Sequence, residues 1–208
     1  MGKLSSPALI NYLRERGINI ELAKRECKEL RYEYEGKTYF VVGFPNIAGG
    51  YELRNRYFKE CIAPKDITHI RQQGEQRTAC YLFEGFMDYL SFLTIRVNNP
   101  EKPRTKKQDY MVLNSVANLS KAEQLLRPYS QIGCFLDNDQ AGKKAYENLK
   151  KIFGNRLQDI SQHYKEHKDL NEYLCHRNQA KQAKKKSQVQ SVRQMPQPQP
   201  KKKRGFRL

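Results

Sequence analysis

The spacing of apolar residues changes along the chain. Over residues 8–13 apolar side chains recur at the interval of an α-helix, and residues 18–27 repeat this pattern more briefly. Residues 31–46 then form two strand-like runs around a Glu-Gly pair, where glycine supplies the positive φ of a tight hairpin turn. Residues 49–60 predict one further strand. Residues 1–74 are therefore expected to form a small α+β subdomain.

After residue 74 the strand-like runs become apolar throughout. ACYLF, YMVL and IGCFL are three continuous apolar runs, LQDIS is a weaker fourth, and helical stretches separate them. Alternation of strands and helices at this spacing calls for a parallel sheet flanked by helices. Residues 75–177 therefore predict an α/β domain with a four-stranded parallel sheet.

The end of the chain has a different composition. Residues 178–208 are rich in Gln, Lys and Pro, and they hold ten Lys or Arg and no acid. With so little to bury, this segment is expected to be a disordered basic tail. The formal net charge of the chain is +17, so the residues before the tail are basic as well. This balance favours a polyanion partner, nucleic acid ahead of a membrane; the alternative is that lysine only keeps the protein in solution.

The five cysteines are scattered and form no C-x-x-C pair, which argues against a disulfide framework and against a zinc site. Neither a signal-peptide pattern nor an apolar segment long enough to cross a bilayer occurs. These features are typical of a reduced cytoplasm, and no membrane partner is expected.

Acidic residues follow the predicted strands. Ligands bind at the carboxyl ends of the strands in parallel α/β sheets, so acids at these ends should converge. Like charges in such a cluster repel, and a divalent cation between them relieves the repulsion. Carboxylates without a nearby His or Cys indicate Mg²⁺ or Mn²⁺ rather than zinc. The acids in question are Glu84, Asp88, Asp137, Asp139 and Asp169.

The segments that hold these acids resemble the three acidic motifs of the Toprim superfamily. They read YLFEGFMDYLSFL, GCFLDNDQAGKKA and HKDLNEYL, and the Glu-Gly-Phe-Met-Asp form is most similar to the bacterial DnaG-type primases. VLNSVANLSKAEQLL and ALINYLRERGINIELAKRE also resemble segments of those primases. The resemblance is strong over residues 81–174 and looser from residue 8 onward. Compact members of this kind occur on mobile elements; the zinc-binding module usual in the family has no counterpart in this chain.

The resemblance implies a role for each acid. Four of them would coordinate Mg²⁺ or Mn²⁺: Glu84, Asp88, Asp137 and Asp139. Asp169 would complete the catalytic group, and Glu84 would also act as a general acid-base. Basic residues near these motifs are candidates for binding nucleic acid or nucleotide: Arg54, Arg56, Lys59, Lys143, Lys144 and Lys168. For the first three, an ordinary exposed strand face is an equally good interpretation.

The function that the resemblance implies is synthesis of short primers on a single-stranded DNA template from nucleoside triphosphates. A helicase or another replication protein is a further partner that it implies. Three alternatives stay open on the sequence. The same acids could serve a Toprim-type nuclease or, less well, a topoisomerase, and they could form a structural metal site in a non-catalytic DNA-binding accessory protein of a plasmid or mobile element.

Overall fold

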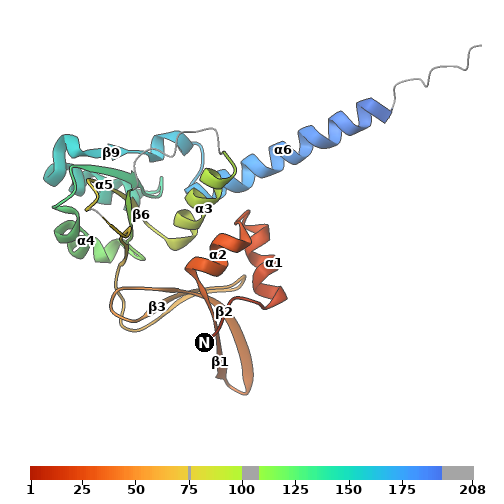
Figure 1. Ribbon diagram of the computed structural model, residues 1–208, viewed down its shortest axis with the longest axis horizontal. Helices are drawn as coiled ribbons and strands as arrows, with labels where there is room; N and C mark the ends of the chain where they lie inside the picture. The colour runs from red at the N-terminus through yellow and green to blue at the C-terminus, as the bar shows by residue number, and fades with distance from the viewer. Residues whose placement is uncertain (75, 100–107, 194–208) are drawn as a thin grey trace, which may run out of the picture. The chain divides into compact units, whose positions relative to one another are not determined.

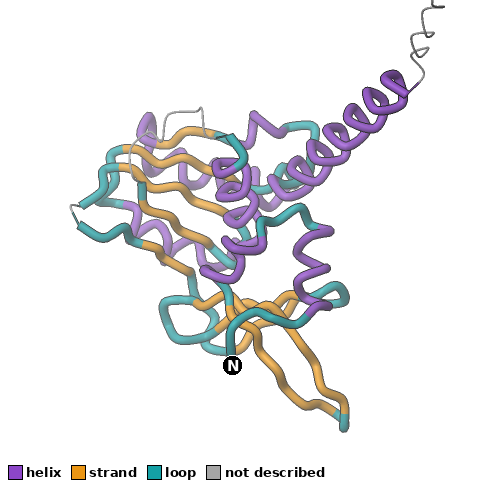
Figure 2. Tube along the Cα trace, turned by 45° about the vertical axis from the view of Figure 1, so that its right-hand side comes forward, coloured by secondary structure: helices purple, strands orange, loops and turns teal. Residues whose placement is uncertain are grey.

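The computed structural model describes residues 1–74, 76–99 and 108–193 (Figure 1 and Figure 2). The chain divides into two units, a compact one from Met1 to Cys175 and a second one from His176 to Leu208. All the candidate site residues belong to the first unit.

Two short helices open the compact unit, as the apolar spacing predicts. They are α1 (Pro7–Glu15) and α2 (Ile20–Glu26). Proline suits the first position of α1, where no backbone N–H is needed for the helix. Gly17 follows α1 with a φ of +72°, a backbone conformation that glycine adopts without steric strain. The side chain of Asn19 caps α2 and accepts hydrogen bonds of 3.0 and 3.2 Å from two N–H groups of its first turn.

An antiparallel sheet follows these helices, with the strand order β1-β2-β3-β4. Its strands are β1 (Lys28–Tyr34), β2 (Lys37–Pro45), β3 (Tyr51–Arg54) and β4 (Lys59–Ile62). The hairpin predicted around the Glu-Gly pair is confirmed by the register of β1 and β2. Glu35 and Gly36 have φ values of +50° and +70°, which suit the two central residues of a tight hairpin turn.

Residues 49–60 do not form the single strand that their sequence predicts. β3 ends at Arg54 and β4 begins at Lys59, and these two residues lie opposite each other in the hairpin. Asn55 Oδ1 accepts two backbone N–H bonds, of 2.8 and 3.0 Å, and closes the turn between them. The expectation was wrong because a short polar side chain lets the backbone turn. Arg54 therefore does not share a strand face with Arg56.

The second sheet has five strands in the order β5-β7-β6-β8-β9. Its strands are β5 (Thr68–Ile70), β6 (Ala79–Phe83), β7 (Asp109–Val112), β8 (Gln131–Phe135) and β9 (Leu157–Asp159). The four strands β7, β6, β8 and β9 are parallel, as predicted. β5 adds an antiparallel edge, and its three residues are too few to show a period. The sheet is therefore mixed and mostly parallel.

Helices cover both faces of this sheet (Figure 1). They are α3 (Phe86–Val97), α4 (Leu119–Leu126) and α5 (Gln140–Phe153), with short 3-10 helices η1 (Val116–Asn118), η2 (Gly154–Arg156) and η3 (Ser161–Tyr164). On one face Leu82 and Met111 of the sheet pack with Leu126 of α4 and Leu149 of α5, and all four side chains are fully buried. Burying a leucine side chain contributes about 1.5–3 kcal/mol, so this layer is a major source of stability.

The other face of the sheet shares its core with the N-terminal helices. Phe83 of β6 and Leu90 of α3 belong to the same buried cluster as Leu13 of α1 and Leu22 of α2. The backbone N–H of Asn19 also donates to Thr94 Oγ1 of α3, at 3.0 Å. The two lobes are thus packed together within the compact unit, and a domain boundary at residue 74 stays a prediction.

The last helix, α6 (Leu170–Arg193), is longer than expected. The sequence predicts a short helix to residue 177 and disorder from there on, whereas the structure continues the helix through residues 178–193. This stretch contains no Gly or Pro and is rich in Ala, Lys and Gln, which are strong helix formers. Residues 194–208, also expected to be disordered, lie outside the described residues. In the described part of the chain no helix has the length and apolar character that crossing a membrane requires.

Candidate active site

Five carboxylates reach the edge of the second sheet at which its parallel strands end. β6 and β8 pair with Phe83 beside Phe135, so the chain leaves both strands at the same edge. Glu84 follows β6 directly, and Asp137 comes just after β8. The other three acids lie at the starts of helices: Asp88 in the first turn of α3, Asp139 at the N-cap of α5, and Asp169 just before α6.

Two backbone hydrogen bonds connect these acidic segments. The N–H of Asp137 donates to Glu84 Oε2 at 3.3 Å, which links the end of β8 to the end of β6. The N–H of Asn171 donates to Asp88 Oδ1 at 3.1 Å, which links the start of α6 to α3. Segments far apart in the sequence are therefore held together at the site.

Asp139 and Asp169 each accept a hydrogen bond at a helix start. Asp139 Oδ1 accepts the N–H of Gly142 at 3.0 Å, and Asp169 Oδ1 accepts an N–H of the first turn of α6 at 2.7 Å. Gly142 is needed at its position, because a Cβ atom there would collide with the carbonyl oxygen of Asp137. This close approach lets α5 begin directly against the end of β8.

The carboxylates lie close enough together for their charges to raise one another's pKa. Burial raises the pKa of Asp137 to about 7, and the charges of Glu84 and Asp169 contribute. Burial also raises the pKa of Asp88 well above its usual value, with Asp169 and Asp137 adding to it. The pKa of Glu84 is raised by burial and by the charge of Asp139. The structure thus brings together all five acids that the sequence singled out.

The chemistry of this group fits a hard divalent cation. Every donor is a carboxylate oxygen, the ligand type that Mg²⁺ and Mn²⁺ prefer, and a cation would relieve the mutual repulsion. Across the described residues, however, no three His, Cys, Asp or Glu side chains converge as closely as a metal ion requires. Metal coordination by Glu84, Asp88, Asp137 and Asp139 therefore stays a prediction.

Two of the predicted lysines interact with the acids through their charge. Lys168 Nζ is 3.9 Å from Asp139 Oδ2. The charges of Lys168 and of Lys59, which is on β4, both oppose the rise in the pKa of Glu84 that burial causes. The antiparallel sheet thus contributes a positive side chain to the edge of the site.

Arg54, at the end of β3, lies within range of the charge of one of these acids, Asp88. Burial lowers the pKa of its guanidinium, the nearby charge of Arg16 adds to this lowering, and Asp88 opposes it. Arg16 lies just after α1, and its Nε atom is buried without a hydrogen-bond partner among the described residues. The sequence pattern gives no signal for Arg16, because only the fold brings the end of α1 close to Arg54.

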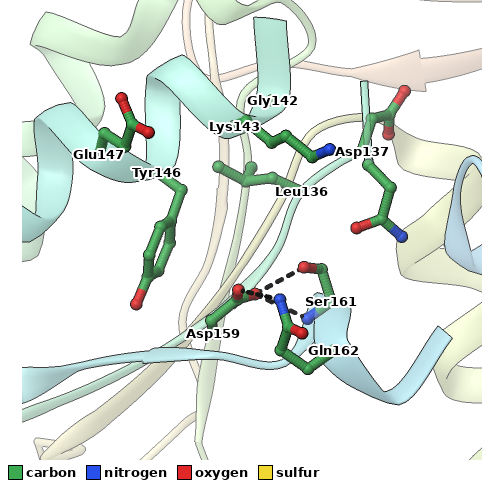
Figure 3. A pocket seen from close by; sticks show the side chains of 10 residues that line it. Leu136, Asp137, Gly142, Lys143, Tyr146, Glu147, Asp159, Ser161 and Gln162 are labelled. Atoms are coloured by element: carbon green, nitrogen blue, oxygen red, sulfur yellow. Dashed lines mark hydrogen bonds between the residues drawn. The ribbon is translucent and has the colours of Figure 1, made fainter. Parts of the chain in front are cut away.

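The other three predicted basic residues are placed differently. Arg56 forms an ion pair with Glu15 of α1 and is exposed. Lys143 lines a cavity of about 130 Å³ beside Asp137, and Figure 3 shows its side chain extending from α5 toward that acid. Lys144 is exposed and does not line this cavity.

Asn138 was missed in the sequence, although it stands between the two aspartates of the Asp-x-Asp motif. Its Nδ2 donates to the carbonyl oxygens of Tyr164, at 3.1 Å, and His167, at 2.8 Å. Its backbone N–H donates to the carbonyl oxygen of Lys168 at 2.7 Å. Asn138 thereby fixes the segment before α6 against the end of β8.

Two family models match the sequence. One is a domain of unknown function (DUF8464) that matches residues 1–63, and the other, described as Toprim-like, matches residues 81–174. The second match covers the strands and helices that hold the five acids. Residues 81–174 form a Toprim-like domain. Toprim domains typically bind Mg²⁺, in keeping with the carboxylate donors found in this one.

Solved structures with the same fold extend the likeness beyond the Toprim-like domain. The primase fragment of the bacteriophage T7 primase-helicase protein is 18% identical, with a TM-score of 0.55 over 87% of this chain and 76% of that chain. A chain from the T7 lagging-strand DNA polymerase interacting with primase domains, bound to an RNA/DNA hybrid and dTTP, is 16% identical. Its TM-score is 0.51, over 86% of this chain and 93% of that chain.

The Aquifex aeolicus primase, with its zinc-binding and RNA polymerase domains, is 12% identical, with a TM-score of 0.49 over 76% of this chain and 50% of that chain. No curated protein matches the sequence. At the identities of the T7 structures the likeness concerns the fold alone. It includes the antiparallel sheet as well as the Toprim-like domain, since it covers most of this chain.

Proposed function

We propose that this chain is a primase-type nucleotidyltransferase that makes short primers on single-stranded DNA from nucleoside triphosphates. The observation that carries the proposal is the group of five carboxylates at the strand-end edge of a Toprim-like domain. The T7 primase domains of similar fold were solved with an RNA/DNA hybrid and dTTP, which are the kinds of ligand that this proposal requires.

In this proposal Mg²⁺ or Mn²⁺ is held by Glu84, Asp88, Asp137 and Asp139, with Asp169 completing the group. When bound, the metal neutralises charge on the triphosphate and lowers the pKa of the primer 3′-hydroxyl. Asp88 is buried and Asp137 is half-buried, which would limit the access of competing water to the reacting groups. Glu84, which lies beside the N–H of Asp137, is the residue we assign to moving the proton of the hydroxyl.

Positive side chains near the acids would hold the phosphates. Arg54, Lys59 and Lys168 are candidates for this role because their charges interact with the site. Arg16 is a further candidate, because its Nε is buried and has no hydrogen-bond partner among the described residues. An anionic triphosphate would satisfy that donor. Lys143 and Lys144, early in α5, would contact template or nucleotide, and the role of Arg56 stays a prediction.

The proposal is tested by incubating the chain with labelled ribonucleotides, single-stranded DNA and Mg²⁺ or Mn²⁺. New short oligomers are the expected product. Shortened DNA in their place would indicate a Toprim-type nuclease. DNA binding with neither product would indicate an accessory role. A helicase or other replication protein can be added in the same assay to test for a partner.

Asp137→Ala is expected to lower the rate of either chemistry by about 10³-fold or more, because the variant lacks a carboxylate of the group. DNA binding, measured by fluorescence anisotropy, should survive. Glu166→Ala is the matched control, since it removes an exposed acid that precedes Asp169, and it should leave the rate unchanged. Undiminished activity in Asp137→Ala would refute the site assignment.

A further inference from the structure

A second cavity, of about 400 Å³, lies at the other end of the parallel strands. The residues that line it include Arg71, Gln72, Arg77, Asp109, Leu125 and Tyr129. They precede or begin the parallel strands β6, β7 and β8, whereas the five acids follow strand ends. The cavity and the acids are therefore at opposite edges of the sheet. The five residues of β6 alone separate them by roughly 17 Å.

Arg77 presents an unsatisfied donor at this cavity. Its Nη2 donates to the carbonyl oxygen of Gln73 at 3.0 Å, which fixes the guanidinium. Its Nε is buried and has no hydrogen-bond partner in the part of the chain that the structure describes. A buried N–H without an acceptor costs free energy, so the guanidinium of Arg77, which lines the cavity, has a donor left to satisfy.

Arg71 adds a second positive charge at the exposed rim. Burial lowers the pKa of His69 and the charge of Arg71 lowers it further, which places the guanidinium close to the cavity wall. Within the described residues neither Arg71 nor Arg77 forms an ion pair. Both guanidinium groups are thus available to an anion.

Both oxygens of the carboxylate in the cavity wall already accept hydrogen bonds. Asp109 is buried, and its Oδ1 accepts the N–H of Gln72 at 2.8 Å while its Oδ2 accepts the Tyr129 hydroxyl at 2.7 Å. The Tyr129 oxygen lies 2.9 Å from His69 Nε2. This network forms a rigid wall with one negative charge beside two positive ones, so the lining as a whole is positive.

We propose that this cavity binds a phosphate group, from a free nucleotide or from the backbone of single-stranded DNA. Arg77 Nε would donate to a phosphate oxygen, and Arg71 would close over it at the rim. Leu125 and Pro128 offer an apolar wall against which a base or sugar can lie. The volume lies within the range of about 300–1,000 Å³ that is usual for small-ligand sites. The site is separate from the proposed catalytic group and does not depend on it.

The test is isothermal titration calorimetry of the full chain with ATP and, separately, with a short oligothymidylate, in buffer containing EDTA. Chelation removes metal-dependent binding at the acids. Arg77→Gln should raise the dissociation constant of the bound probe about tenfold, the size expected when a charge-assisted hydrogen bond is removed. Arg71→Gln, at an exposed position that the fold tolerates, should raise it about threefold.

Two controls make the result specific. Arg127→Gln removes the same charge from an exposed helix end near the cavity and should leave the dissociation constant unchanged. Arg77→Gln should raise the dissociation constant by the same factor when it is made together with Asp137→Ala, so a failure of the proposed function would not affect this result. Loss of ATP affinity in Arg77→Gln and Arg71→Gln indicates a free nucleotide and loss of oligothymidylate affinity indicates DNA, and either loss supports the site. The proposal is overturned if neither probe binds, if Arg71→Gln binds normally, or if Arg127→Gln weakens binding equally.

Discussion

At the scale of single residues, Asn138 connects two parts of the candidate site. Asp137 and Asp139 on either side of it belong to the β8–α5 turn, while Lys168 and Asp169 belong to the segment before α6. The three hydrogen bonds of Asn138 join the turn to that segment. A hydrophobic or acidic side chain at this position could not donate to the two carbonyl oxygens that the amide reaches.

Asn138→Ala is expected to lower the free energy of unfolding by about 1–2 kcal/mol, because it leaves two carbonyl oxygens without their donor. Asn138→Asp should cost more, since a carboxylate would face those oxygens. Urea unfolding measures both. Asn11→Ala, at an exposed position of α1, is the control and should stay within about 0.5 kcal/mol. Equal stability of Asn138→Ala and the unmodified chain would show that the amide does not fix this segment.

Glu29 has a structural role far from the acids. Its side chain is 2% exposed, and Oε2 accepts the N–H groups of Ser5, at 2.9 Å, and Ser6, at 2.7 Å. Burial alone would raise the pKa of Glu29, but these bonds and the Arg31 guanidinium outweigh it and lower the pKa. The ionised side chain thus holds the N-terminal segment against β1.

The lowered pKa of Glu29 predicts a pH dependence of stability. The ionised Glu29 contributes fully to the free energy of unfolding above the unfolded-state pKa of about 4.3. This contribution is lost as the pH falls through the lower pKa of the folded state. Glu29→Gln should therefore flatten the fall of the urea midpoint between about pH 5 and pH 3. Glu60→Gln, at an exposed position of β4, should leave the slope as it is. A slope unchanged by Glu29→Gln would contradict the lowered pKa.

At the scale of elements, α1 and α2 pack on α3 and so join the antiparallel sheet to the Toprim-like domain. Besides the shared core, the Tyr89 hydroxyl of α3 donates to Glu26 Oε2 of α2 at 3.0 Å. Because Lys59 and Arg54 reach the acids from the antiparallel sheet, this packing determines where the positive charges lie. Stability and site geometry therefore depend on the same helix packing.

Leu13→Ala tests this coupling, since Leu13 is fully buried between the lobes' helices. It should lower the free energy of unfolding by about 3 kcal/mol and keep a single cooperative transition for both lobes. Circular dichroism and tyrosine fluorescence during urea unfolding measure this. Ile152→Ala on α5, where the side chain is 45% exposed, should cost less than about 1 kcal/mol. Two separate transitions would contradict a shared core.

The elements that could be predicted are those whose signal lies within one continuous segment. β6 and β8 are continuous apolar runs that end in acids, so both the sheet edge and the acidic group followed from the sequence. The turn at Asn55 and the short β5 could not be predicted, because a single side chain and a three-residue pairing decide them. Arg16 was missed for another reason: its position near Arg54 depends on tertiary packing.

At the scale of the whole molecule, the positive charge is spread unevenly. The chain carries a net charge of +17, and residues 178–208 hold ten Lys or Arg without an acid. The described part of this segment is helical, so its first four Lys residues lie on a regular scaffold. Long-range attraction to a polyanion should depend strongly on this segment and on ionic strength.

Deleting residues 178–208 is expected to leave the compact unit folded and to weaken binding to single-stranded DNA. For every phosphate that the segment neutralises, its removal should reduce the slope of log K against log salt by about 0.7. Fluorescence anisotropy over a series of salt concentrations measures the slope. Changing Lys184, Lys185 and Lys186 together to Gln is the matched variant, because glutamine keeps the helix propensity while it removes three charges. If the segment binds DNA through its charge, the triple variant should show part of the decrease in slope that the deletion shows. An unchanged slope in the deletion and in the triple variant would mean that the segment does not touch DNA. The basic residues of the compact unit would then account for the binding.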